Sequence, residues 1–148
     1  MTDSPGTAPT PPDPDREAAL DSLERLVGTW DVSGPGLRGQ VRFHWLNRRR
    51  SFLVQEVDLD QDGEGAQGVE YIGYDPQARQ LRSHYFGTED RPLEYTWQVA
   101  DDTLTIWFGD PSSPARYVGT FSAGGTTNAG AWEWPGGGYR STMTRSAS

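Results

Sequence analysis

The chain has 148 residues, a length that suits one domain with a hydrophobic core of its own. Its net charge of −8 disfavours binding to nucleic acids and to anionic membranes, because like charges repel. The absence of cysteine excludes disulfides, thiol nucleophiles and cysteine-ligated metal centres. The sequence has neither a run of about 18 apolar residues nor a secretory leader, so we expect a cytoplasmic protein.

The first part of the chain divides into a tail and a helix. Residues 1–14 are rich in proline and polar residues, which predicts a disordered tail, and residues 15–148 then form a single domain. Asp15 is the expected N-cap of a short helix that ends at Gly28. Its inward stripe consists of Ala19, Leu20, Leu23, Leu26 and Val27. A helix this short needs a surface to pack on, and one end of a barrel would provide it.

From Gly28 onward, apolar and polar residues alternate with the period of two that is typical of β-strands. Turn residues separate about ten such strands at spacings of roughly 8–14 residues, which favours an antiparallel meander. The expected turns and loops are 34–36, 47–50, 60–65, 75–76, 101–102 and 111–114, followed by glycine-rich turns. No repeated segment suggests a propeller.

The expected number of strands favours a closed sheet over an open one. An open sheet of about ten strands would leave two exposed edges, which closure into a barrel removes. We therefore predict an up-and-down antiparallel barrel, wide enough to hold a small ligand. A β-sandwich is the alternative, because strand spacing alone does not separate the two.

Short motifs in a characteristic order resemble the calycin superfamily of lipocalins, fatty-acid-binding proteins and nitrobindin-like barrels. The helix running into Leu26-Val27-Gly28-Thr29-Trp30 resembles the N-terminal signature of that superfamily. Other segments look like an uncharacterised bacterial family of calycin-like barrels: Phe52-Leu53-Val54-Gln55, Ile72-Gly73-Tyr74-Asp75-Pro76, Ser83-His84-Tyr85-Phe86 and Tyr117-Val118-Gly119-Thr120-Phe121. The resemblance covers roughly residues 20–145. It implies a barrel with an internal cavity and carries no activity.

Two departures from the relatives limit what the resemblance implies. Nitrobindin-like haem barrels use a histidine near the C-terminus, whereas no histidine follows His84 here, so we expect no haem and no other cofactor. Gly87-Thr88-Glu89 stands where relatives often have an acidic residue directly after the Tyr-Phe pair. In such barrels the first-strand tryptophan plugs the closed end, so we assign Gly28 and Trp30 structural roles.

Three candidate metal or charge sites lack support in the sequence. Asp58, Asp60 and Asp62 resemble the start of an EF-hand loop, but the twelfth position is valine and an acidic hairpin loop fits better. His44 and His84 have no spacing that pairs them on a metal, and no third ligand is signalled, so we expect no metal site. The run 48–50 of three arginines is typical of a solvated turn.

Six residues are the candidates for lining a cavity. Tyrosine, histidine and arginine would orient oxygen atoms of a ligand, and tryptophan would cover a flat apolar body. The candidates are Tyr71, Arg82, His84, Tyr95, Trp97 and Arg116. If the assigned alternation of a strand is shifted by one residue, the side chains expected to face inward face outward instead.

The leading hypothesis is a barrel that binds a small hydrophobic or amphipathic molecule through burial, with a few polar groups setting its orientation. A second hypothesis is an enzyme of the isomerase or cyclase type, with His84 or a tyrosine as acid or base. A third is a self-associating structural domain with a filled barrel, and a homodimer stays open. A cavity of about 300 Å³ or more with His84 facing inward would favour binding or catalysis.

Overall fold

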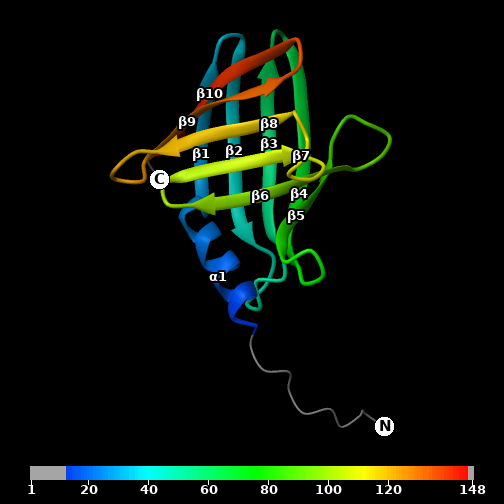
Figure 1. Ribbon diagram of the computed structural model, residues 1–148. Helices are drawn as coiled ribbons and strands as arrows, with labels where there is room; N and C mark the ends of the chain where they lie inside the picture. Colours follow the sequence, from blue (N-terminus) through cyan, green and yellow to red (C-terminus); the bar gives the residue numbers. More distant parts are fainter. Residues whose placement is uncertain (1–12, 147–148) are drawn as a thin grey trace.

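The computed structural model describes residues 13–146, which form a closed ten-stranded antiparallel barrel with a short helix at one end (Figure 1). The predicted tail lies almost entirely outside these residues. No helix in the described part of the chain is long and apolar enough to span a membrane. The elements are α1 (Pro14–Leu23), η1 (Glu24–Leu26), β1 (Gly28–Gly34), β2 (Leu37–Trp45), β3 (Leu53–Gln61), β4 (Glu64–Asp75), β5 (Gln80–Phe86), β6 (Leu93–Ala100), β7 (Thr103–Phe108), β8 (Arg116–Phe121), β9 (Thr127–Trp134) and β10 (Gly137–Arg145).

The strand order confirms the up-and-down barrel. Every strand pairs antiparallel with its neighbours along the chain, and β1 also pairs with β10, where Trp30 lies opposite Arg145. This last ladder closes the sheet, so the sandwich alternative is wrong. In Figure 1, β6, β7 and β8 cross steeply in front of β1 to β4, as expected for the inclined strands of a barrel.

The predicted loop 60–65 is wrong, because β3 and β4 are joined by only two residues. Asp62 and Gly63 form this turn with φ values of 53° and 87°, and backbone of that kind matches the twist of a tight hairpin. Asp60 accepts a hydrogen bond from the Gly63 N–H, and Asp58 accepts one from the side chain of Gln67. The acidic side chains thus serve the hairpin, and the described residues contain no group of three metal-binding side chains there or elsewhere.

The helix begins earlier than the sequence suggested. Asp13, rather than Asp15, is the N-cap: its Oδ1 accepts hydrogen bonds from the backbone N–H groups of Asp15 and Arg16 at 2.9 and 3.4 Å. Pro14 occupies the first helical position, where a missing N–H has no cost. After α1 the chain tightens into η1 before β1 starts at Gly28.

Trp30 lies at the closed end of the barrel, beneath the helix, and is fully buried. Its Nε1 donates a hydrogen bond of 2.8 Å to the Leu26 carbonyl. The Arg145 guanidinium stacks 4.3 Å from the centre of the Trp30 ring and donates to the Val27 carbonyl, which fixes the entry of the chain into β1. Gly28, with φ of 128°, lets this guanidinium approach, since a Cβ there would meet Arg145 Nη1 at 2.6 Å.

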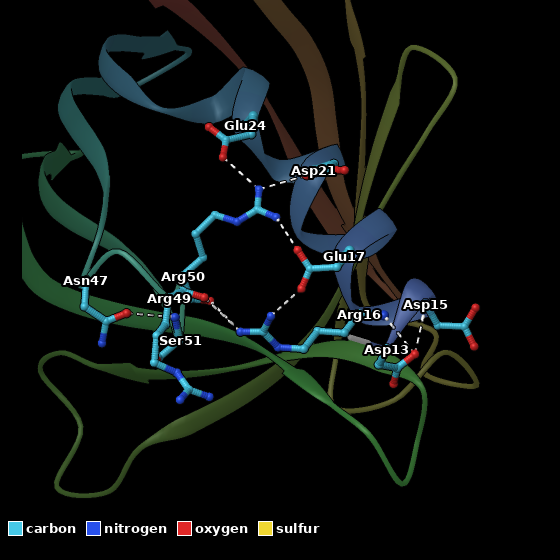
Figure 2. Close-up of polar contacts among 10 residues, drawn as sticks. All are labelled: Asp13, Asp15, Arg16, Glu17, Asp21, Glu24, Asn47, Arg49, Arg50 and Ser51. Carbon is cyan, nitrogen blue, oxygen red and sulfur yellow. Dashed lines mark hydrogen bonds and ion pairs between the residues drawn. The ribbon is translucent and has the colours of Figure 1, made fainter. Parts of the chain in front are cut away.

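Arg50 fastens the helix to the loop between β2 and β3 (Figure 2). Its guanidinium pairs with Glu17 at 3.1 Å and with Asp21 and Glu24 at 2.9 Å each. These three acids follow one another at helical spacing, so they share one face of the helix. Arg50 also lies over the ring of Trp45, 5.3 Å from its centre. The interpretation of the arginine run 48–50 as solvated is therefore wrong for Arg50.

We expect Arg50→Gln to lower the free energy of unfolding by about 1 kcal/mol, because three partly exposed ion pairs are lost together. The measurement is urea denaturation at low and at high salt, and the effect should shrink in high salt, where charges are screened. Arg49→Gln is the matched control, since Arg49 is the exposed neighbour and should change stability by less than about 0.5 kcal/mol. Equal effects of the two variants would contradict the role of Arg50.

Candidate functional site: the barrel cavity

The interior of the barrel contains a partly open cavity of about 340 Å³, within the size range of ligand sites. It extends from Phe43 and Leu104, near the closed end, to Gln61 and Ala66, beside the β3–β4 turn. Its walls are mainly aliphatic and aromatic, with a few polar groups. The lining residues are Val32, Leu37, Val41, Phe43, Gln55, Val57, Leu59, Gln61, Ala66, Glu70, Tyr85, Tyr95, Trp97, Leu104, Ile106, Tyr117, Trp132, Tyr139, Ser141 and Met143.

Glu70 of β4 carries a carboxyl group in the wall of this cavity, and its side chain is buried. Oε2 accepts hydrogen bonds from Ser83 Oγ at 2.5 Å and from Trp97 Nε1 at 3.2 Å. Oε1 accepts one from Gln55 Nε2 at 2.9 Å. A carboxylate has about four acceptor positions, so these three donors leave room at Oε1 for one more. Three neighbouring strands, β3, β5 and β6, supply the donors and hold the carboxyl group in place.

Burial raises the pKa of Glu70 from 4.5 to about 7, against the opposing effect of the hydrogen bonds from Ser83, Trp97 and Gln55. Desolvation dominates because the low-dielectric interior penalises the charged form. The carboxyl group therefore gains or loses its proton near neutral pH. A group of this kind can act as a hydrogen-bond donor, a negative charge or a proton acceptor within the cavity.

Four tyrosines from other strands line the same cavity: Tyr85, Tyr95, Tyr117 and Tyr139. Burial raises the pKa of each phenol, and the negative charge of Glu70 raises those of Tyr85 and Tyr95 further. The pKa of Tyr117 reaches about 12, and its hydroxyl donates to Asn128 Oδ1 at 2.7 Å. The phenols thus stay neutral at physiological pH.

Aromatic rings form one continuous wall of the cavity. The ring centre of Trp132 lies 5.9 Å from that of Tyr95 and 5.9 Å from that of Tyr117. Trp97, two residues after Tyr95 on β6, meets Phe43 edge to face at 6.4 Å. Such contacts fix the orientation of the rings, which present their π faces or edges to the interior.

The structure divides the six sequence-predicted lining residues into two groups. Tyr95 and Trp97 line the cavity. The other four are absent from its lining and lie on strand positions that alternate with the inward-facing ones: Tyr71, Arg82, His84 and Arg116. The expected cavity is therefore present, but His84 does not face into it, because its side chain is exposed on the outer face of the barrel.

The four outward residues belong to the surface of the barrel. Tyr71 packs edge to face between Phe52 and Phe86, with ring centres 6.2 and 6.1 Å away. Arg82 lies 3.8 Å from a carboxylate oxygen of Glu94, while Arg116 and His84 are exposed. The second histidine, His44, also lies on the outer face, where it contacts Glu56 at 2.8 Å.

Sequence reasoning missed the polar centre of the site. The missed residues are Gln55, Glu70, Tyr85, Tyr117, Trp132 and Tyr139. A signal was present in β4, where Glu70 shares its parity with Ile72 and so with the inner face. It was hidden because Val69 and Tyr71, on the opposite parity, are also apolar.

A scan against protein-family models finds no match for this chain, and a search of curated proteins finds no similar protein. The resemblance to calycin-like barrels therefore stays a prediction.

Proposed function

We propose that this protein binds a small, partly apolar molecule inside the barrel. The observation that carries the proposal is the cavity of about 340 Å³, lined by aliphatic and aromatic side chains around the hydrogen-bonded carboxyl group of Glu70. Burial of the ligand would supply most of the binding free energy, and the polar groups would set its orientation. An internal cavity of this size favours binding over the hypothesis of a filled structural barrel.

Filling the cavity should abolish binding. Ser141 lines the cavity on β10, at the same strand parity as Tyr139 and Met143, which also line it. In Ser141→Trp the indole would occupy the space of the ligand. We expect the affinity for the neutral fluorescent probe N-phenyl-1-naphthylamine to fall at least tenfold, measured by its fluorescence increase on binding.

Thr142→Trp is the matched control for this experiment. Thr142 is the next residue of the same strand and lines a depression on the outer face, so the same indole would point away from the cavity. This variant should bind the probe as the unmodified protein does. Thermal unfolding of both variants checks that the barrel is intact. Probe binding that survives Ser141→Trp in a folded protein, or no binding to the unmodified protein, would count against the proposal.

Native mass spectrometry of the protein purified from its own host addresses the ligand directly. A retained mass that disappears in Ser141→Trp and persists in Thr142→Trp would locate the molecule in the cavity. The retained compound would then also give the specificity.

One observation favours a second candidate, acid–base catalysis in the same cavity. Glu70 has a pKa of about 7, which suits a group that must both take and give a proton near neutral pH. In this reading Glu70, rather than His84, would be the acid or base. The test is to incubate the co-purified compound with the protein and with Glu70→Gln: chemical change only with the former supports an enzyme.

A further inference from the structure

We propose that the molecule bound in the cavity is an organic cation, such as a primary or quaternary ammonium compound, whose positive group lies beside Glu70 and against the aromatic wall. This inference rests on the proposed function and names the chemical class of its ligand. It follows from the charge of the cavity, from the kind of side chains around that charge, and from the free acceptor position on the carboxyl group.

The first argument is the lack of a counter-charge. Among the described residues that line the cavity, Glu70 is the one acidic side chain, and none is arginine or histidine. Its three donors, Gln55, Ser83 and Trp97, are all neutral. Ionising a buried carboxyl group carries a large desolvation free energy unless a positive charge compensates it. A cationic ligand would supply that charge, and an ammonium N–H could use the remaining acceptor position on Oε1.

The second argument is the aromatic lining. Tyr95, Trp132 and Tyr117 form one wall of the cavity. Trp97 also lines the cavity and donates its indole N–H to Glu70. The face of an aromatic ring attracts a cation, and this attraction increases when water is excluded. Several rings around one carboxylate are therefore suited to an ammonium group. An anionic ligand such as a fatty acid would instead meet the negative charge of Glu70 and gain no basic partner from the lining.

The test compares two molecules of the same shape. Phenyltrimethylammonium carries a permanent positive charge, and tert-butylbenzene is its neutral counterpart. Titrations monitored by tryptophan fluorescence at pH 8 can report both, since Trp97 and Trp132 line the cavity. We expect the cation to bind at least tenfold more tightly than the neutral molecule. In Glu70→Gln this preference should disappear. In Glu56→Gln, which removes the same charge from the exposed outer face of β3, the preference should be kept.

The pH profile of the unmodified protein provides a readout that needs no variant. The other titratable groups in the cavity lining are the phenols of Tyr85, Tyr95, Tyr117 and Tyr139, which remain neutral below pH 9. Protonation of Glu70 alone should therefore weaken the binding of phenyltrimethylammonium, roughly tenfold from pH 8 to pH 6 for a pKa of about 7. Binding of tert-butylbenzene should not follow this profile.

Each outcome has a distinct meaning. Equal or tighter binding of tert-butylbenzene at pH 8, or a preference for the cation that persists in Glu70→Gln, would overturn the inference. The proposed function would still stand, because a neutral molecule or the naphthylamine probe would be bound in the cavity. Failure of the cation, the neutral molecule and the naphthylamine probe to bind would overturn the proposed function and the inference together.

Discussion

Trp30→Ala should lower the free energy of unfolding by about 3–5 kcal/mol, the usual cost of removing a large buried aromatic side chain. The indole is fully buried, so its loss leaves a void in the core that it shares with Leu20, Leu23 and Leu26 of the helical segment. It also leaves the Leu26 carbonyl without its hydrogen bond and the Arg145 guanidinium without its stacking partner. Because domains of this size are stable by only about 5–15 kcal/mol, the variant should be close to unfolding.

Trp134→Ala is the control, since it makes the same chemical change at the opposite end of the barrel. Trp134 is 42% exposed at the end of β9, where its main aromatic contact is Tyr139. We expect a loss of about 1 kcal/mol or less there. The measurement is urea denaturation followed by circular dichroism, which does not depend on the fluorescence of the replaced tryptophan. A similar loss in both variants would show that Trp30 is not the anchor of the closed end.

The fold was largely predictable because the turns of this chain are locally encoded. Proline, glycine or aspartate interrupts the alternation of apolar residues at every hairpin except β2–β3, where Asn47 begins the turn, and strand number then favours closure. The errors arose where the same residues are compatible with two local structures. Pro14 reads as part of a proline-rich tail, yet it also suits the first position of a helix capped by Asp13. The acidic segment 60–65 reads as a loop, although Asp62 and Gly63 alone make the turn.

The site was less predictable because a strand pattern gives two faces and does not say which is inside. On β5 the sequence favoured Arg82 and His84, whereas Ser83 and Tyr85 face inward. Both parities carry aromatic or polar residues, so hydrophobicity alone does not decide. The decisive information is long-range: the hydrogen bonds of Glu70 come from β3, β5 and β6 and exist only once these strands have paired around β4.

The ligand-free protein should become more stable as the pH is lowered from 8 to 5, by about 2–3 kcal/mol, because of Glu70. The folded-state pKa of about 7 lies above the ordinary value of 4.5, so the folded protein holds this proton more tightly than the unfolded chain does. The stabilisation is complete below pH 4.5 and is lost as the pH rises through 7. The measurement is urea denaturation across this range, in the protein and in Glu70→Gln.

Glu70→Gln should remove this dependence on pH and be the more stable of the two at pH 8, while Glu56→Gln, an exposed change on β3, should retain it. A rise in stability that persists in Glu70→Gln would assign the effect to another group.

The sign of this effect of pH on stability bears on function. An ionised carboxylate in a wall of aromatic and aliphatic residues opposes folding, and an apolar residue would not. A bound cation should reverse this: it would stabilise the charged form, lower the pKa of Glu70 and raise the stability at pH 8 more than at pH 5.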